Sequence, residues 1–313
     1  MRILLTGTSG QVGGALLPLL EKRATVIAPD KTAFDLARPG LIESRLDEFR
    51  PDLIVNPAAY TAVDKAEDEV ERAMLINAQA PAAMAHWATA NKVPLVHFST
   101  DYVFDGSGSR AWREDDPTGP LSIYGRSKFM GEEAVRRAGG PHLVIRTAWV
   151  YAAEGANFMS TMIRLARERE TLRVVSDQWG TPTTARDIAA AVTEIIDRGS
   201  LDLPGMFAGA EGLVHLTNSG STSWHGFASA IIDGLRKRDV ALTAGQVASI
   251  TTADYPTMAV RPANSRLDLG RLERVYGLVP PAWPDALATE LDHFLAIEAA
   301  AEIAAGGPQA GAR

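Results

Sequence analysis

The sequence predicts an α/β protein built on a doubly wound parallel sheet, with a smaller, mostly C-terminal subdomain. Short apolar runs alternate with stretches of helical periodicity in the first half of the chain, a pattern typical of βαβ units. The runs lack the polar alternation of a half-exposed sheet, so helices should cover both of its faces. A glycine-rich segment lies where the first strand should meet the first helix, as in sheets that bind dinucleotides.

Five apolar runs have the length of buried strands, namely residues 2–5, 25–28, 53–56, 93–99 and 143–146. Residues 63–91, between the third and fourth runs, form a long helical pattern that Pro81 interrupts. Because proline removes a backbone donor and clashes one turn back, two helices or one bent helix are predicted there. Beyond residue 150 the alternation loosens, and the predicted elements are a strand over 213–216 and helices over 158–169, 184–198 and 223–238.

These elements divide the chain into a dinucleotide-binding domain over residues 1–150 and a mainly substrate-binding subdomain over residues 151–297. Segments around residues 177–218 should return to the first domain. The segment from Glu298 to Arg313 is rich in alanine and glycine and contains little that could be buried, so we expect a flexible tail.

Composition excludes several classes of protein. With 46% hydrophobic and 22% charged residues, the 313-residue chain has an ordinary globular composition. It contains no cysteine, which rules out disulfides, thiolate metal sites and a cysteine nucleophile and fits a cytoplasmic location. No signal-like segment and no run of about 20 apolar residues is present, so we expect no membrane association. A net charge of −7 has the wrong sign for binding nucleic acid.

Three glycines, Gly7, Gly10 and Gly13, follow the first predicted strand at G-x-x-G-x-x-G spacing. Glycines at a strand–helix junction allow a tight turn, and they let backbone N–H groups approach a pyrophosphate at the positive end of the helix. Asp30 ends the second apolar run and follows Gly10 by 20 residues, the offset at which an acidic side chain binds the adenosine ribose. Its charge repels a 2′-phosphate, an effect that Lys31 partly offsets, so NADH should be moderately preferred over NADPH.

Tyr124 and Lys128 are four residues apart, which places them on one face of a helix. Such a pair is common by chance, but here it lies downstream of a dinucleotide fingerprint. A lysine ammonium near a phenol favours the phenolate, so we expect Lys128 to lower the pKa of Tyr124 and permit proton exchange near neutral pH. Thr100 and Asp101 directly follow an apolar strand, at the edge where such sheets bind ligands, and the Thr100 hydroxyl could hydrogen-bond a reacting carbonyl.

Seven segments together form a highly specific combination, namely residues 7–13, 56–67, 99–104, 124–128, 146–151, 177–183 and 261–267. In these segments, and over nearly the whole chain up to about residue 295, the sequence resembles the extended short-chain dehydrogenase/reductases and, within them, the dTDP-4-dehydrorhamnose reductase family. The resemblance implies that NADH or NADPH reduces the 4-keto group of dTDP-4-dehydro-β-L-rhamnose, giving dTDP-L-rhamnose.

The resemblance also implies roles for individual residues. Three of them, Thr100, Tyr124 and Lys128, would be catalytic. The cofactor site would be lined by Gly10, Gln11, Val12, Asp30, Asp35, Leu36, Ala59, Tyr60 and Thr61, with Tyr124 and Lys128 facing it. The sugar nucleotide would contact Thr100, Asp101 and Trp149 and be held by Val63 and the segment from Arg261 to Asn264. The family more often has alanine at position 57 and histidine at position 60, where this chain has Pro57 and Tyr60.

Two other functions remain open. A 4,6-dehydratase or epimerase of the same superfamily would share the tyrosine–lysine pair, but dehydratases that resemble this family place a glutamate directly after the Thr-Asp pair, where this chain has Tyr102. A non-catalytic dinucleotide-binding regulatory subunit is the second alternative. The presence of Thr100, Tyr124 and Lys128 argues against it, since a subunit that only binds needs no proton donor.

No metal site is expected. None of the six histidines has the spacing of metal ligands. Some members of the resembled family hold a cation between two subunits through acidic residues in the first helix and in a later helix, and this chain has Ala15 and Arg186 there. The expected state is therefore a monomer, or a dimer that no metal bridges.

Overall fold

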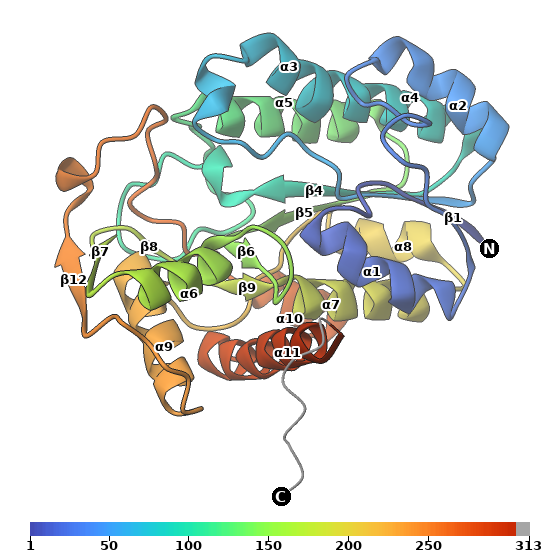
Figure 1. The fold of residues 1–313 in the computed structure, drawn as a ribbon. Coiled ribbons are helices and arrows are strands. Elements are labelled where there is room, and N and C mark those ends of the chain that lie inside the picture. The colour runs from blue at the N-terminus through green and yellow to red at the C-terminus, as the bar shows by residue number, and fades with distance from the viewer. Residues whose placement is uncertain (305–313) are drawn as a thin grey trace, which may run out of the picture.

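A computed structural model describes residues 1–304, and its centre is a six-stranded parallel sheet (Figure 1). The strands follow one another in the order β10–β5–β4–β3–β1–β2, and each neighbouring pair is parallel. The order reverses at β1, so the sheet is doubly wound, as predicted. The strand bounds are β1 (Arg2–Leu5), β2 (Thr25–Ile27), β3 (Leu53–Asn56), β4 (Leu95–Thr100), β5 (His142–Thr147) and β10 (Leu213–His215).

Helices cover both faces of this sheet (Figure 1). Alternate residues of one strand face opposite sides, so Ile3 and Leu5 of β1 enter one core while Leu4 enters the other. This double burial is why the strands read as continuous apolar runs. One core includes α1 (Gln11–Glu21), α7 (Ala185–Arg198), α8 (Leu203–Gly209) and α10 (Gly270–Tyr276), and the other includes α2 (Ile42–Phe49), α4 (Ala80–Asn91) and α5 (Ile123–Ala138).

The helical pattern over residues 63–91 is interrupted on the N-terminal side of Pro81, not at the proline itself. A 3₁₀ turn over Lys65–Glu67 leads to α3 (Val70–Met74), then to a π-helical turn over Leu75–Gln79, and α4 follows directly. Pro81 lies in the first turn of α4, where its missing N–H has no helical partner to lose. The predicted bend is therefore a π-helical turn, a feature that is frequent at functional sites.

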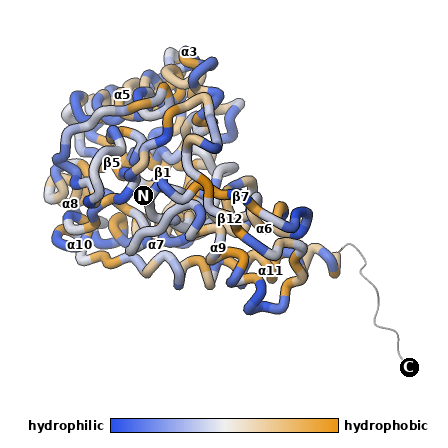
Figure 2. The backbone as a smooth tube through the Cα atoms, turned by 90° about the vertical axis from the view of Figure 1, so that its left-hand side faces the viewer, coloured by the Kyte–Doolittle hydropathy of each residue, from blue (hydrophilic) through white to orange (hydrophobic). Residues whose placement is uncertain are grey.

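A third, smaller core forms the subdomain. It joins α6 (Phe158–Glu168), α9 (Trp224–Arg236) and α11 (Trp283–Ala304) to a parallel pair, β7 (Thr171–Val175) and β12 (Gln246–Ile250). Figure 2 shows these elements on one side of the sheet domain. Two short pairings complete the subdomain, β6 (Val150–Tyr151) with β9 (Thr183–Thr184) and β8 (Trp179–Gly180) with β11 (Thr222–Ser223).

Residues 298–304 are helical, although the sequence analysis placed them in a flexible tail. Helix α11 continues to Ala304, and Glu298 accepts hydrogen bonds of 2.6 and 2.7 Å from Arg167. The expectation was wrong for residues 298–304 because alanine is a strong helix former and the Arg167 pair holds this turn against α6. Residues 305–313 lie outside the described residues. Within the described part of the chain, no helix is long and apolar enough to cross a membrane.

Helix α5 approaches the π-helical turn closely at Gly131, where a Cβ atom would lie 2.0 Å from the carbonyl oxygen of Asn77. We therefore expect Gly131→Ala to lower the free energy of unfolding by at least about 1 kcal/mol, because overpacking outweighs the better helix propensity of alanine. Thermal unfolding measures this, with Gly40→Ala as the control, since a Cβ there meets nothing within 4 Å. Equal melting temperatures for the two variants would contradict the close approach.

Candidate active site

The turn between β1 and α1 can be built only with glycine at two positions. Gly7 has a φ of 62°, and a Cβ on Gly13 would lie 2.2 Å from the carbonyl oxygen of Gly7. Helix α1 therefore starts directly against the end of β1. No side chain caps its first turn, and that turn contains no acidic residue. Its backbone N–H groups and the helix dipole thus form a cradle for an anion such as a pyrophosphate.

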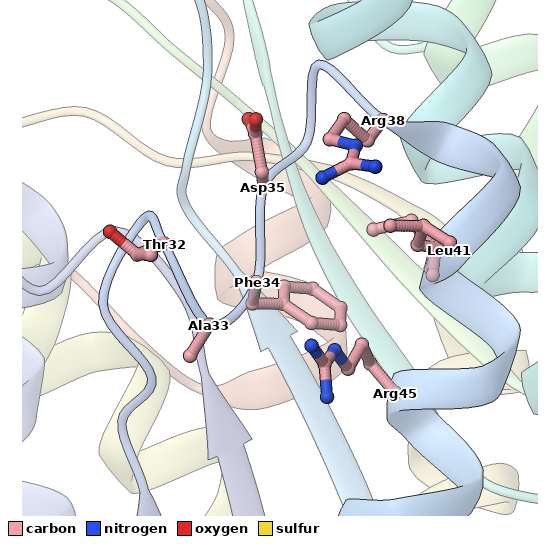
Figure 3. Close-up of a pocket in the computed structure, with 8 residues that line it drawn as sticks. Thr32, Ala33, Phe34, Asp35, Arg38, Leu41 and Arg45 are labelled. Carbon is pink, nitrogen blue, oxygen red and sulfur yellow. The ribbon is translucent and has the colours of Figure 1, made fainter.

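The segment after β2 places Asp30 at the surface, with its carboxylate held in one orientation. Its Oδ1 atom accepts hydrogen bonds from the backbone N–H groups of Thr32 and Ala33, at 2.9 and 2.8 Å. A small pocket follows, lined in part by Asp35, with Arg38 and Arg45 on the side of α2 (Figure 3).

Leu36, which the resemblance placed in the cofactor site, is buried in the core beneath α2 and α4. Its side chain is therefore committed to packing. Any contact of Leu36 with a cofactor would have to come from its backbone.

Asn77 joins the loop after β3 to the helix that contains Tyr124. Its side-chain oxygen accepts from the N–H of Tyr60 at 2.8 Å, and its amide nitrogen donates to Tyr60 O at 2.9 Å and to Ser127 Oγ at 3.0 Å. Ser127 in turn donates to the carbonyl oxygen of Tyr124 at 2.8 Å. The sequence analysis missed Asn77, although an asparagine inside an apolar helical pattern was an available signal.

The structure brings the three expected catalytic residues to the carboxyl end of β4. Thr100 ends that strand, and its hydroxyl donates to Asp101 Oδ1 at 3.0 Å. Tyr124 lies in the first turn of α5, and the ring of Tyr102 meets its ring edge-on at a centroid distance of 5.4 Å. Lys128 is buried one turn later and donates to the carbonyl oxygen of Phe98 at 2.6 Å.

Burial governs the protonation of this group. It raises the pKa of Tyr124 to about 12, with the Thr100 hydroxyl opposing and Asp101 adding to the shift. The expected lowering of the tyrosine pKa by Lys128 is thus wrong in this structure, because loss of water outweighs other effects. Burial also lowers the pKa of Lys128 to about 8, although the negative charge of Glu132 opposes this shift. The pKa of Asp101 is raised by burial to about 6. At neutral pH Tyr124 therefore keeps its proton, as a proton donor must.

A buried ion pair anchors α5 beneath the site. Glu132, one turn beyond Lys128, accepts from Arg146 Nε at 3.1 Å and from Ser99 Oγ at 2.9 Å, and Arg146 Nη2 makes a further bond to it. Both charged side chains are almost fully buried. Arg146 and Ser99 come from β5 and β4, so the pair fixes α5 against both strands.

Trp149 lies on the side of the subdomain, and its backbone adopts a left-handed conformation with a φ of 48°. Its ring stacks on that of Trp224 at 3.6 Å, and a Cβ on Gly180 would lie 2.5 Å from the Trp149 ring. The indole is therefore held between α9 and β8. This packing fixes the orientation of the indole.

Two other residues expected to contact the substrate, Asp101 and Val63, lie at different places. Asp101 is buried at the end of β4, and its Oδ2 atom has no hydrogen-bond partner within the described residues. Val63 is half-buried beside Asp64, which is paired with Arg261.

Asn264 was expected to help hold the sugar nucleotide, but its side chain is engaged within the protein. Its amide nitrogen donates to the carbonyl oxygens of Ser107 and Arg110, and its oxygen accepts from Arg266. Because these bonds engage both ends of the amide, the side chain holds the loop after β4 and does not reach toward a ligand.

Comparison with known proteins agrees with this geometry. Residues 1–296 match the family model described as RmlD substrate binding domain. The chain belongs to this family. It is 42% identical over 287 residues to the dTDP-4-dehydrorhamnose reductase of Salmonella typhimurium, covering 90% of this chain and 94% of that protein.

Solved structures of this family share the fold. A dTDP-4-dehydrorhamnose reductase from Clostridium acetobutylicum superposes with a TM-score of 0.85 at 35% identity, over 94% of this chain and 100% of that one. The enzyme of the same name from Bacillus anthracis, solved in complex with NADP, gives 0.83 at 33% identity, over 93% and 99% of the two chains. These matches show the α/β fold of this chain as a whole.

Proposed function

We propose that this protein is an NAD(P)H-dependent reductase that converts the C4 keto group of dTDP-4-dehydro-β-L-rhamnose to an alcohol, giving dTDP-L-rhamnose. The observation that carries the proposal is the convergence of Thr100, Tyr124 and Lys128 at the carboxyl end of β4, the same edge of the parallel sheet at which the glycine turn follows β1. Relatives that share this chain's length bear the name of that activity. Oxidation of NADH or NADPH with dTDP-4-dehydrorhamnose generated in place tests it, with a UDP-linked analogue as the comparison.

The residues present fit a nicotinamide dinucleotide. The glycine turn leaves the uncapped N-terminus of α1 open to a pyrophosphate, and Gln11 and Val12 belong to that first turn. Asp30 would bind the adenosine ribose, while Ala59, Tyr60 and Thr61 would line the nicotinamide side. The reduced nicotinamide supplies the hydride that is added to the sugar C4.

The proton comes from the protein. Tyr124 donates its phenolic proton to the developing alkoxide, and its raised pKa keeps that proton in place until the oxygen becomes basic. Thr100 exchanges its hydrogen bond to Asp101 for one to the same oxygen. The Lys128 ammonium has three donors, of which Phe98 O takes one, so the others can bind the nicotinamide ribose. Trp149 and Asp101 would contact the sugar.

Replacing the proton donor tests this assignment. Tyr124→Phe should keep cofactor binding, because the ring packing against Tyr102 survives, while the rate of reduction falls by roughly 10²–10⁴-fold. Cofactor binding is followed by fluorescence titration and turnover by NADH oxidation. A variant that retains more than about half of the wild-type kcat would remove Tyr124 from the mechanism.

Asp30 should set the preference between the two cofactors. Removing its charge by Asp30→Ala is expected to raise the ratio of kcat/KM for NADPH to that for NADH by about tenfold, since a carboxylate repels a 2′-phosphate. Asp30→Asn is the matched variant, because its side-chain oxygen can still accept from Thr32 and Ala33. An unchanged ratio in both variants would show that Asp30 does not face the ribose.

Activity should need no divalent metal. The guanidinium of Arg186 lies 3.6 Å from the carboxylate of Glu290, so a fixed cation occupies the place where a metal would need acidic ligands. We expect full turnover after treatment with EDTA and an elution volume in gel filtration that EDTA leaves unchanged. A dimer that dissociates and loses activity on chelation would contradict this.

A further inference from the structure

A strap, defined here as residues 251–262, leaves β12 of the subdomain and runs toward the first domain (Figure 1). It is bonded there to the carboxylate of Asp64. Asp64, in the loop after β3, accepts from the backbone N–H of Ala259 at 3.1 Å. It also accepts from Arg261 Nη1 at 3.0 Å through Oδ1 and from Nη2 at 2.7 Å through Oδ2. The same loop contains residues 59–61, which are assigned to the cofactor.

The pairing uses only one edge of the Arg261 guanidinium. A guanidinium has five N–H donors and two edges that can bind an anion through two parallel bonds. Asp64 takes the edge formed by Nη1 and Nη2, and the second Nη1 hydrogen bonds to Ala259 O at 3.2 Å. The edge formed by Nε and Nη2 has no hydrogen-bond acceptor among the described residues. This edge matches two oxygens of a phosphate group.

Arg261 lies within electrostatic range of the proposed reaction centre. Arg261 is near enough to the phenol of Tyr102 for its charge to oppose the rise in the pKa of that group, and the ring of Tyr102 contacts that of Tyr124. Tyr102 is therefore within electrostatic range of the guanidinium and in ring contact with the proposed proton donor. Arg261 itself is partly buried, which strengthens a directed bond to an anion.

We propose that Asp64 is a positioning residue, which holds one edge of Arg261 so that the other edge is presented to the diphosphate of the nucleotide sugar. The inference rests on the proposed function only for the identity of that ligand. Asp64 cancels the charge of Arg261, so recognition comes from the direction of two hydrogen bonds. The carboxylate remains ionised at assay pH, because the hydrogen bond from Arg261 lowers the pKa of Asp64.

Kinetics of Asp64 variants test this role. Asp64→Ala should raise KM for the nucleotide sugar, and Kd for dTDP as the probe, by about tenfold, because the guanidinium is no longer aimed. The kcat and the KM for NADPH should change less than twofold. Asp64→Asn should give a smaller rise, of roughly threefold, since its amide oxygen can still accept one of the two bonds.

A double-mutant cycle with Arg261→Ala separates positioning from general stability. If Asp64 acts through Arg261, Asp64→Ala should change Kd for dTDP less than twofold once Arg261 is absent. Asp197→Asn is the matched control, because Asp197 forms a similarly exposed pair with Arg23 at 2.7 Å, and it should alter neither constant.

The outcomes distinguish this inference from the proposed function. An unchanged Kd for dTDP in Asp64→Ala would overturn the role of Asp64. So would a double variant whose Kd rises by the product of the two single-variant changes, because the residues would then act independently. A parallel loss of kcat and NADPH affinity would show that Asp64 only supports the fold. Wild-type protein that binds dTDP but does not reduce the keto sugar would contradict the proposed function alone, and the binding cycle would still test Asp64.

Discussion

The position of the catalytic helix depends on one buried ion pair. Glu132 and Arg146 lie out of water, so each charge must be compensated by the other and by neighbouring polar groups. Removing one partner of such a pair typically destabilises a protein by about 3–5 kcal/mol. Because Glu132 is on α5 and its partners are on β4 and β5, sliding or rotating the helix would leave a charge unpaired. Tyr124 and Lys128, on the preceding turns, are thereby held at the end of β4.

A second set of bonds ties the cofactor side to the same helix. Asn77 contacts both the backbone of Tyr60 and the hydroxyl of Ser127, so the loop that would line the nicotinamide cannot move independently of Tyr124. Asn77 lies in the π-helical turn, the kind of helix irregularity that is frequent at functional sites. The spacing between this loop and Tyr124 is therefore set by the folded first domain alone.

The fold could be predicted because its signals are local. Runs such as Leu53–Asn56 are buried on both faces, and the spacing of Tyr124 and Lys128 places them together on any helix. The roles of Asn77, Glu132 and Asp64 were missed because each acts through a partner on another element, which spacing within one element does not reveal. The pKa of Tyr124 was misjudged for a related reason, since burial depends on the whole site whereas the effect of Lys128 can be inferred from spacing alone.

The first domain and the subdomain would have different roles in the proposed reaction. The residues proposed for proton transfer all belong to the first domain, whereas the subdomain contributes a stacked indole at Trp149 and, through the strap, a guanidinium at Arg261. In the proposed mechanism neither group takes part in bond making, and both would act by orienting a ligand. A change in strap or indole should therefore alter which nucleotide sugar is bound and how tightly, while the chemistry at Tyr124 remains. Asp64 connects the two parts, because its loop belongs to the first domain and its partner Arg261 belongs to the strap of the subdomain.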